Sequence, residues 1–166
     1  MKNRKKKNFT IIELIVVIAI IAVLMALLMP VVNKMSKRAK ETKAKAEMQS
    51  ITIAIKSYES TYGLLPVPAS WANGDTGTPY SNLMNLLTNV PAGSNSRSIR
   101  FLDVPEDYTA NGYVDPWGNK FHVYMDTDYD GQVTGLAQTD GYGTVFIYST
   151  GSDGTDGTDN DVHSWE

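Results

Sequence analysis

A long, almost uninterrupted apolar run near the N-terminus constrains this chain more than any other feature. Residues 9–29 read FTIIELIVVIAIIAVLMALLM, with only Thr10 and Glu13 as polar interruptions. At about 1.5 Å rise per residue they make a helix of roughly 31 Å, enough to cross the hydrocarbon layer of a membrane. The run is too long for a typical signal-peptide core, and Pro30 follows it in place of a small-x-small cleavage site. The sequence therefore predicts a retained membrane helix over residues 9–32.

The charges divide the chain into two halves. Residues 1–56 carry twelve Lys and Arg side chains against three acidic ones, a net charge of +9, whereas residues 57–166 carry three against fifteen, a net charge of −12. The acidic half lacks the cations that neutralise a row of phosphates, which argues against a nucleic-acid partner. Because basic residues flank the apolar run on both sides, the positive-inside rule leaves the membrane orientation open.

Cysteine and histidine usage excludes several kinds of enzyme. The chain has no cysteine, which removes disulfides, thiol catalysis, iron–sulfur clusters and Cys-type zinc sites. His122 and His163 are the two histidines, and neither has a nucleophile or ligand set beside it in the sequence. We therefore predict that the chain is not an enzyme.

Beyond Asn33 the pattern becomes amphipathic, with apolar residues recurring every three or four positions. This stripe comprises Ala44, Met48, Ile51, Ile55, Tyr58 and Tyr62. It predicts that the helix continues over residues 33–63, ends at Gly63 and packs on a globular domain, with a coiled-coil partner as the alternative. From Phe9 the helix would be roughly 80 Å long.

Residues 64–166 read as a small mixed domain. Residues 81–88 predict a short helix with Ser81 near its cap, and residues 120–125 and 144–149 predict two strands. Residues 132–137 predict a third, weaker strand. The fold class is therefore α+β: a long N-terminal α-helix packed on a small antiparallel β-sheet.

The N-terminal segment resembles that of type IV pilins and type II secretion pseudopilins. That family has Glu at the fifth mature position and commonly Pro at the twenty-second, and Glu13 and Pro30 match when Phe9 is counted as first. The resemblance implies that residues 1–8 are a basic leader, cut between Asn8 and Phe9 by a prepilin peptidase, and that Phe9 is then methylated. Asn8 stands where the family has Gly.

The resemblance also implies how such a helix assembles. The freed ammonium of Phe9 would pair with Glu13 of a neighbouring subunit, so that two charges unfavourable in lipid neutralise each other in register. Pro30 lacks an N–H, and we expect it to kink or locally loosen the helix. In assembled filaments of the family the chain near this Pro is often unwound.

Two C-terminal segments narrow the resemblance to the major, G-type pseudopilins. One is the sequence Asp115-Pro116-Trp117-Gly118, and the other is the closing stretch 147–165 with its acidic loop and terminal Trp. We interpret the first segment as structural: Pro116 fixes a turn, Trp117 buries its ring, and Gly118 permits a sharp reversal. The resemblance covers residues 1–63 and 114–166.

The closing acidic loop suggests calcium. Residues 150–161 carry four aspartates and no basic residue, and hard oxygen ligands on a Gly-rich backbone suit this ion. The resemblance implies that Asp153, Asp159 and Asp161 bind one calcium together with backbone carbonyls. The alternative is a solvated tail, although Val162 and Trp165 could anchor the loop.

A second calcium site is possible at residues 126–132. Asp126, Asp128 and Asp130, followed by Gly131 and the carbonyl of Gln132, match the first half of an EF-hand loop. The bidentate twelfth position is Ala137 rather than Glu, and Asp140 could substitute if the loop bends. The alternative, an Asp130-Gly131 turn between strands, has equal weight.

Together these features predict a structural subunit of a type II secretion pseudopilus. It would be a precursor in the bacterial inner membrane, with its globular domain in the periplasm. Copies of the chain would then polymerise into a helical, periplasmic filament. The resemblance implies a prepilin peptidase, an inner-membrane platform, an ATPase and minor pseudopilins as partners. The alternatives are a type IV pilin for adhesion, motility or DNA uptake, and a monomeric, membrane-tethered calcium-binding domain.

Overall fold

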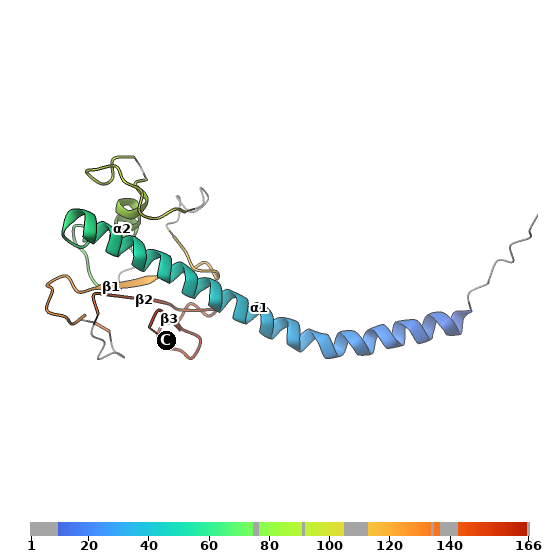
Figure 1. Ribbon diagram of the computed structural model, residues 1–166. Helices are drawn as coiled ribbons and strands as arrows, with labels where there is room; N and C mark the ends of the chain where they lie inside the picture. The colour runs from blue at the N-terminus through green and yellow to red at the C-terminus, as the bar shows by residue number, and fades with distance from the viewer. Residues whose placement is uncertain are drawn as a thin grey trace, which may run out of the picture. The chain divides into compact units, whose positions relative to one another are not determined.

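The computed structural model describes residues 10–74, 77–90, 92–104, 113–133, 135–136 and 143–165. Asn8, Phe9, Ala137 and Asp140 lie outside these ranges. The elements follow one another along the chain as α1 (Ile11–Tyr62), α2 (Thr78–Thr88), β1 (His122–Met125), β2 (Val145–Ser149) and β3 (Val162–His163) (Figure 1). The chain forms two compact units, which meet within α1 between Ala39 and Lys40.

The long N-terminal helix predicted from the sequence is confirmed. Its C-terminal end is set by Gly63, which has a φ of 77° and donates its N–H to the carbonyl of Glu59. A glycine in this left-handed conformation is the usual way in which a helix ends. Pro30 lies inside α1, and the helix continues through it, so the loosening expected there is not seen in the single chain.

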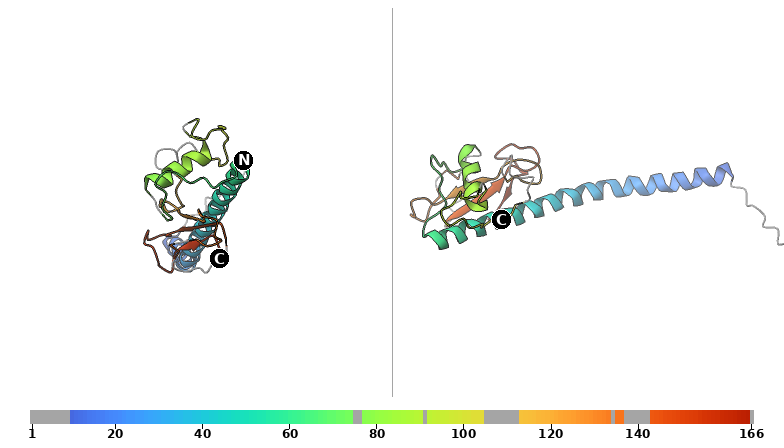
Figure 2. Two further views of the ribbon diagram at one scale, coloured as in Figure 1. Left: turned by 90° about the vertical axis from the view of Figure 1, so that its left-hand side faces the viewer. Right: turned by 90° about the horizontal axis from the view of Figure 1, so that it is seen from above.

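The second half of α1 forms the base of the globular unit. Its buried residues are Ala44, Met48, Ile51, Ala54, Ile55 and Tyr58. The predicted stripe is thus confirmed except at Tyr62, which is half-buried. Figure 2 shows this part of α1 lying along the globular unit, and its apolar stripe packs into the core there.

The sheet has three antiparallel strands in the order β1-β2-β3. The first two predicted strands are confirmed, with Val123 opposite Ile147. The third prediction was wrong: the described residues between 132 and 137 form no strand, and β3 takes that place. Gly131 and Gly135 have φ values of 83° and 94°, and such left-handed residues break an extended run.

Alternation along the strands gives the sheet two apolar faces. Phe121, Val123 and Ile147 join the core against α1. On the opposite face, Tyr124, Phe146 and Tyr148 form a second cluster, against which Val133, Leu136 and Trp165 pack. The acidic half of the chain is therefore held together by two layers of apolar and aromatic side chains.

Helix α2 contributes Tyr80, Leu83 and Leu87 to the core. It begins three residues before the predicted start, with Gly77 at its N-cap and a proline in its first turn, so the predicted capping role of Ser81 was wrong. Proline fits there because the first N–H groups of a helix have no partner within it. Burial raises the pKa of Tyr80, whose hydroxyl donates to the Tyr113 carbonyl.

Candidate functional site

The first half of α1 presents an apolar surface on which none of the described residues packs. All large apolar side chains from Ile11 to Met35 are exposed, with exposed fractions between 45% and 79%. Among the described residues, α1 is the helix that is long and apolar enough to cross a membrane. Contiguous apolar surface of this extent is unfavourable in water, so lipid or other helices must cover it.

Glu13 is the single acidic residue in this apolar segment, and it closes the start of α1. Its Oε2 accepts hydrogen bonds from the Thr10 N–H and the Thr10 hydroxyl, both at 2.8 Å. The Thr10 hydroxyl oxygen in turn accepts the Glu13 N–H at 3.3 Å. This is a capping box, in which the side chains at the N-cap and three residues later satisfy each other's N–H groups. Sequence reasoning missed Thr10, although Thr-x-x-Glu is the pattern that signals such a cap.

The cap reduces the cost of Glu13 in a membrane without removing it. An N-cap interaction stabilises a helix by about 1 kcal/mol, whereas a carboxylate at the centre of a bilayer costs about 2.5–3.5 kcal/mol. Glu13 lies one turn from the helix start, where the cost is lower. The carboxylate therefore retains the capacity to bind a cation supplied by another molecule.

Asp115 organises the loop between Val114 and Lys120. Its buried carboxylate accepts the N–H groups of Trp117 at 2.9 Å and Asn119 at 2.8 Å. Its other oxygen accepts the hydroxyl hydrogen of Ser149, in β2. The structural interpretation of residues 115–118 is refined: Gly118, with a φ of 97°, permits the reversal as expected, while the Trp117 ring is half-buried against the core.

The loop at residues 126–132 brings three aspartates together. One ligand oxygen from each of Asp126, Asp128 and Asp130 lies within 4.8 Å of the others. The buried Asp126 carboxylate also accepts the N–H groups of Asp130 and Gly131, and the Gln132 N–H bonds to Asp130. The geometry therefore contains both a turn held by Asp126 and a group of carboxylates open to solvent at Asp128 and Asp130.

The closing loop holds its acidic residues through hydrogen bonds. Asp153 accepts the Thr155 N–H at 2.9 Å, and Asp161 accepts the Gly157 N–H at 2.9 Å. The hydroxyl of Thr158 lies between them, 3.2 Å from Asp153 Oδ2 and 3.4 Å from Asp161 Oδ1. The N–H of Thr155, with side-chain hydrogen bonds from Asn160 and Thr158, lowers the pKa of the Asp153 carboxyl.

Both loops contain oxygen donors that suit calcium, but their carboxylates converge to different degrees. Their side-chain donors are carboxylate, hydroxyl and amide oxygens, which suit a hard cation and do not select zinc. Among the described residues, it is the second predicted set, at 126–130, whose carboxylates converge. In the first set, the Thr158 hydroxyl lies between the carboxylates of Asp153 and Asp161, and Asp159 is exposed.

Comparisons with known proteins give one match to the N-terminal segment and one that spans nearly the whole chain. Residues 3–29 match the family model described as a prokaryotic N-terminal methylation motif. The chain is 25% identical over 170 residues to the type II secretion system core protein G of Aeromonas hydrophila, and the match spans 99% of this chain and 96% of that protein. No solved structure matches the chain.

Proposed function

We propose that this chain is a G-type pseudopilin, which polymerises through α1 into a type II secretion pseudopilus that supports protein export across the outer membrane. The observation that carries the proposal is the bare apolar half of α1, residues 11–35. A single span needs only lipid to cover it, but a span with a carboxylate at Glu13 gains from a cationic partner. The protein is a structural subunit and not an enzyme.

Assembly uses the amino group of Phe9 as that partner. Once the peptide bond between Asn8 and Phe9 is cut, the new ammonium of one subunit pairs with Glu13 of the next. Neither charge is favourable in lipid without the other, so the pair favours copies that are correctly aligned along the helix. Pro30, whose ring removes one backbone hydrogen bond, marks the place where α1 unwinds in the polymer.

Leader removal and assembly require further partners. A prepilin peptidase removes the leader, an inner-membrane platform with its ATPase extracts subunits from the membrane, and minor pseudopilins share the filament. The globular unit lies in the periplasm, on the same side as the growing polymer. Intact-mass measurement of chain extracted from membranes tests the first step, since retention of all eight leader residues in an assembled filament contradicts it.

Calcium belongs to this proposal as a support of the globular unit. Asp153, Asp159 and Asp161 hold one ion in the closing loop, and Asp126, Asp128 and Asp130, with the Gln132 carbonyl, hold a second. The oxygen-only donors of both loops support this assignment.

Calorimetric titration of calcium into the apo chain tests the two sites separately. Asp128→Asn should remove one ion, Asp153→Asn should remove the other, and each site should raise the melting temperature. Binding of no calcium by the wild-type chain contradicts both sites.

The decisive test of polymerisation is the removal of one charge from α1. In cells that lack their own major pseudopilin, Glu13→Gln should reduce sheared filaments and exported protein by about tenfold or more, because it leaves the Phe9 ammonium buried without a partner. The control, Glu41→Gln, removes the same charge outside the apolar segment and should assemble. Filaments of normal yield from Glu13→Gln would support the alternative of a monomeric, membrane-tethered domain.

A further inference from the structure

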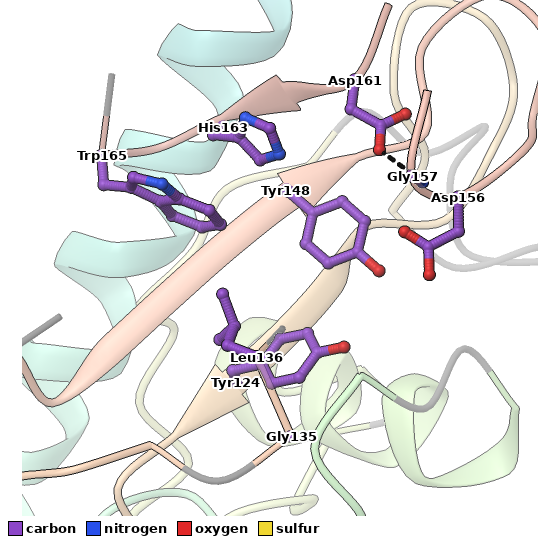
Figure 3. A pocket seen from close by; sticks show the side chains of 9 residues that line it. All are labelled: Tyr124, Gly135, Leu136, Tyr148, Asp156, Gly157, Asp161, His163 and Trp165. Carbon is purple, nitrogen blue, oxygen red and sulfur yellow. Dashed lines mark hydrogen bonds between the residues drawn. The ribbon is translucent and has the colours of Figure 1, made fainter. Parts of the chain in front are cut away.

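A pocket of about 140 Å³ opens on the face of the sheet that bears the second apolar cluster. Strands β1 and β2 supply its floor, the closing loop one wall, and the C-terminal segment another. Figure 3 shows its side chains, which include Tyr124, Leu136, Tyr148, Asp156, His163 and Trp165. The pocket plays no part in the polymerisation of α1 described above.

A row of neighbouring aromatic rings forms one side of this pocket. The ring centroids of Tyr124 and Tyr148 lie 5.9 Å apart, those of Tyr148 and His163 lie 5.9 Å apart, and those of His163 and Trp165 lie 4.6 Å apart. The faces of Tyr and Trp rings attract cations. They also provide an apolar surface for the methylene groups of a long side chain.

The other side of the pocket is polar and carries negative charge. Figure 3 shows the hydroxyls of Tyr124 and Tyr148 on the side where Asp156 lies. Burial, followed by hydrogen bonds with Tyr124 and Asp156, raises the pKa of Tyr148, so its hydroxyl stays protonated and donates. Asp161 also lines the pocket, but its Oδ2 accepts the Gly157 N–H. Asp156 is exposed, and it lies outside the predicted calcium ligands.

An apolar aromatic wall that leads to a carboxylate fits a side chain with a long stem and a cationic head. Lys and Arg have this form, because their methylenes pack on apolar surface while the charged group reaches a polar partner. We infer that the pocket binds a Lys or Arg side chain from residues 34–45 of a neighbouring copy of this chain. This inference rests on the proposed polymer, in which copies lie side by side.

The distribution of charge selects that segment as the occupant. Residues 57–166 carry a net charge of −12, so like faces of two globular units repel each other. The basic side chains between the apolar segment and the globular unit are Lys34, Lys37, Arg38, Lys40, Lys43 and Lys45. Residues 34–40 are exposed, whereas Lys43 and Lys45 lie on either side of Ala44, which is buried in the core of the globular unit. Lys34, Lys37, Arg38 and Lys40 are thus the cations that complement the pocket.

Cysteine cross-linking locates the contact directly, because the full chain has no cysteine of its own. Four double variants carry Cys at 156 together with Cys at 34, 37, 38 or 40, and are oxidised within assembled filaments. At least one pair should give disulfide-linked dimers and longer ladders. The matched control carries Cys at 64, an exposed position, together with the same four partners, and should give none.

Charge variants test the chemistry of the contact. Asp156→Asn should lower filament yield about two- to fivefold, the range expected for one exposed ion pair, and Asp156→Lys should lower it further. Changing the cross-linked cation to Asp in the Asp156→Lys background should restore the yield. Asp103→Asn removes an exposed carboxylate away from the pocket and should leave the yield unchanged.

The outcomes separate this inference from the function on which it rests. If the wild-type chain forms filaments that Glu13→Gln abolishes, yet none of the four double variants with Cys at 156 cross-links between subunits, the pocket contact is wrong and the polymer stands. If the wild-type chain forms no filaments, the proposed function itself fails. If Asp156→Asn instead lowers calcium affinity and leaves the filament yield unchanged, Asp156 is a metal ligand and the inference is overturned.

Discussion

The two halves of α1 use the same helical geometry in opposite ways. Residues 11–35 are apolar on all sides and leave that surface bare, whereas residues 44–58 are apolar on one side and bury it against the sheet. The first half can be stable only with a partner from outside the chain, either lipid or a further helix. The apolar side of the second half is buried by other residues of the same chain. One continuous helix thus joins a surface made for assembly to a surface made for folding.

The largest expected effect comes from neighbouring isoleucines on the folded half. Ile51 is fully buried, so Ile51→Ala should lower the free energy of unfolding of the globular unit by about 2–5 kcal/mol. Ile53 is 64% exposed, so Ile53→Ala should change it by no more than about 0.5 kcal/mol. Urea unfolding of the detergent-solubilised chain, followed by tryptophan fluorescence, measures both.

Ile20 extends this comparison to the assembly half. It is 55% exposed, and Ile20→Ala should leave the unfolding of the globular unit unchanged while it weakens the association of helices. A large loss of stability from Ile20→Ala would show that the halves do not fold independently, and the contrast between them would be lost.

The second largest effect is expected at Asp115, in the acidic half. Asp115→Ala leaves the N–H groups of Trp117 and Asn119 and the hydroxyl of Ser149 without their acceptor. Each buried group left unsatisfied costs about 1–3 kcal/mol, and we expect a total loss of about 3 kcal/mol in the same unfolding experiment. Asp103→Ala, at a side chain that is 89% exposed, is the control and should have little effect.

The elements that sequence reasoning predicted correctly are those specified by local pattern. The apolar run, the stripe from Ala44 to Tyr58 and the alternation in β1 and β2 depend on residues close together in the chain, so periodicity identifies them. Strand β3 has only two residues, and its pairing with Ser149 and Tyr148 defines it. A run that short carries no period of its own.

The candidate sites also differ in whether residues close together in the chain or far apart form them. The spacing of Asp126, Asp128 and Asp130 pointed to a turn or a calcium site, and in the structure one turn brings their carboxylates together. The role of Asp115 depends on Ser149, which is 34 positions away, and no local pattern encodes that contact. The pocket beside Asp156 was missed for the same reason, since its walls come from both strands, the closing loop and the C-terminal segment.

A smaller effect is expected at the start of the assembly half. Thr10→Ala removes the two hydrogen bonds that its N-cap side chain makes with Glu13, and should weaken the first turn of α1 by about 1 kcal/mol. Hydrogen exchange of the N–H groups of Glu13 and Leu14 in detergent micelles should become about fivefold faster. Thr52→Ala, inside the folded half, is the control, and unchanged exchange in Thr10→Ala would contradict the capping box.

The smallest effect is expected at Glu47, which contrasts with Glu13 on the same helix. Burial raises the pKa of the Glu47 carboxyl, the neighbouring Asp115 raises it further, and the pair with Lys43 opposes both. Since the folded chain then binds this proton more tightly than the unfolded chain, the group's contribution to stability is full below the ordinary value of 4.5. It is lost as pH rises through the raised pKa.

Glu47→Gln should therefore flatten the pH dependence of unfolding just above pH 4.5. At neutral pH it should stabilise the globular unit by no more than about 0.5 kcal/mol, because it also breaks the pair with Lys43. Glu59→Gln, also on α1, leaves Glu47 in place and should retain the wild-type pH profile. If Glu47→Gln keeps that profile as well, burial does not hold this proton. The pair with Lys43 would then be enough to hold an ionised carboxylate in the folded half of α1.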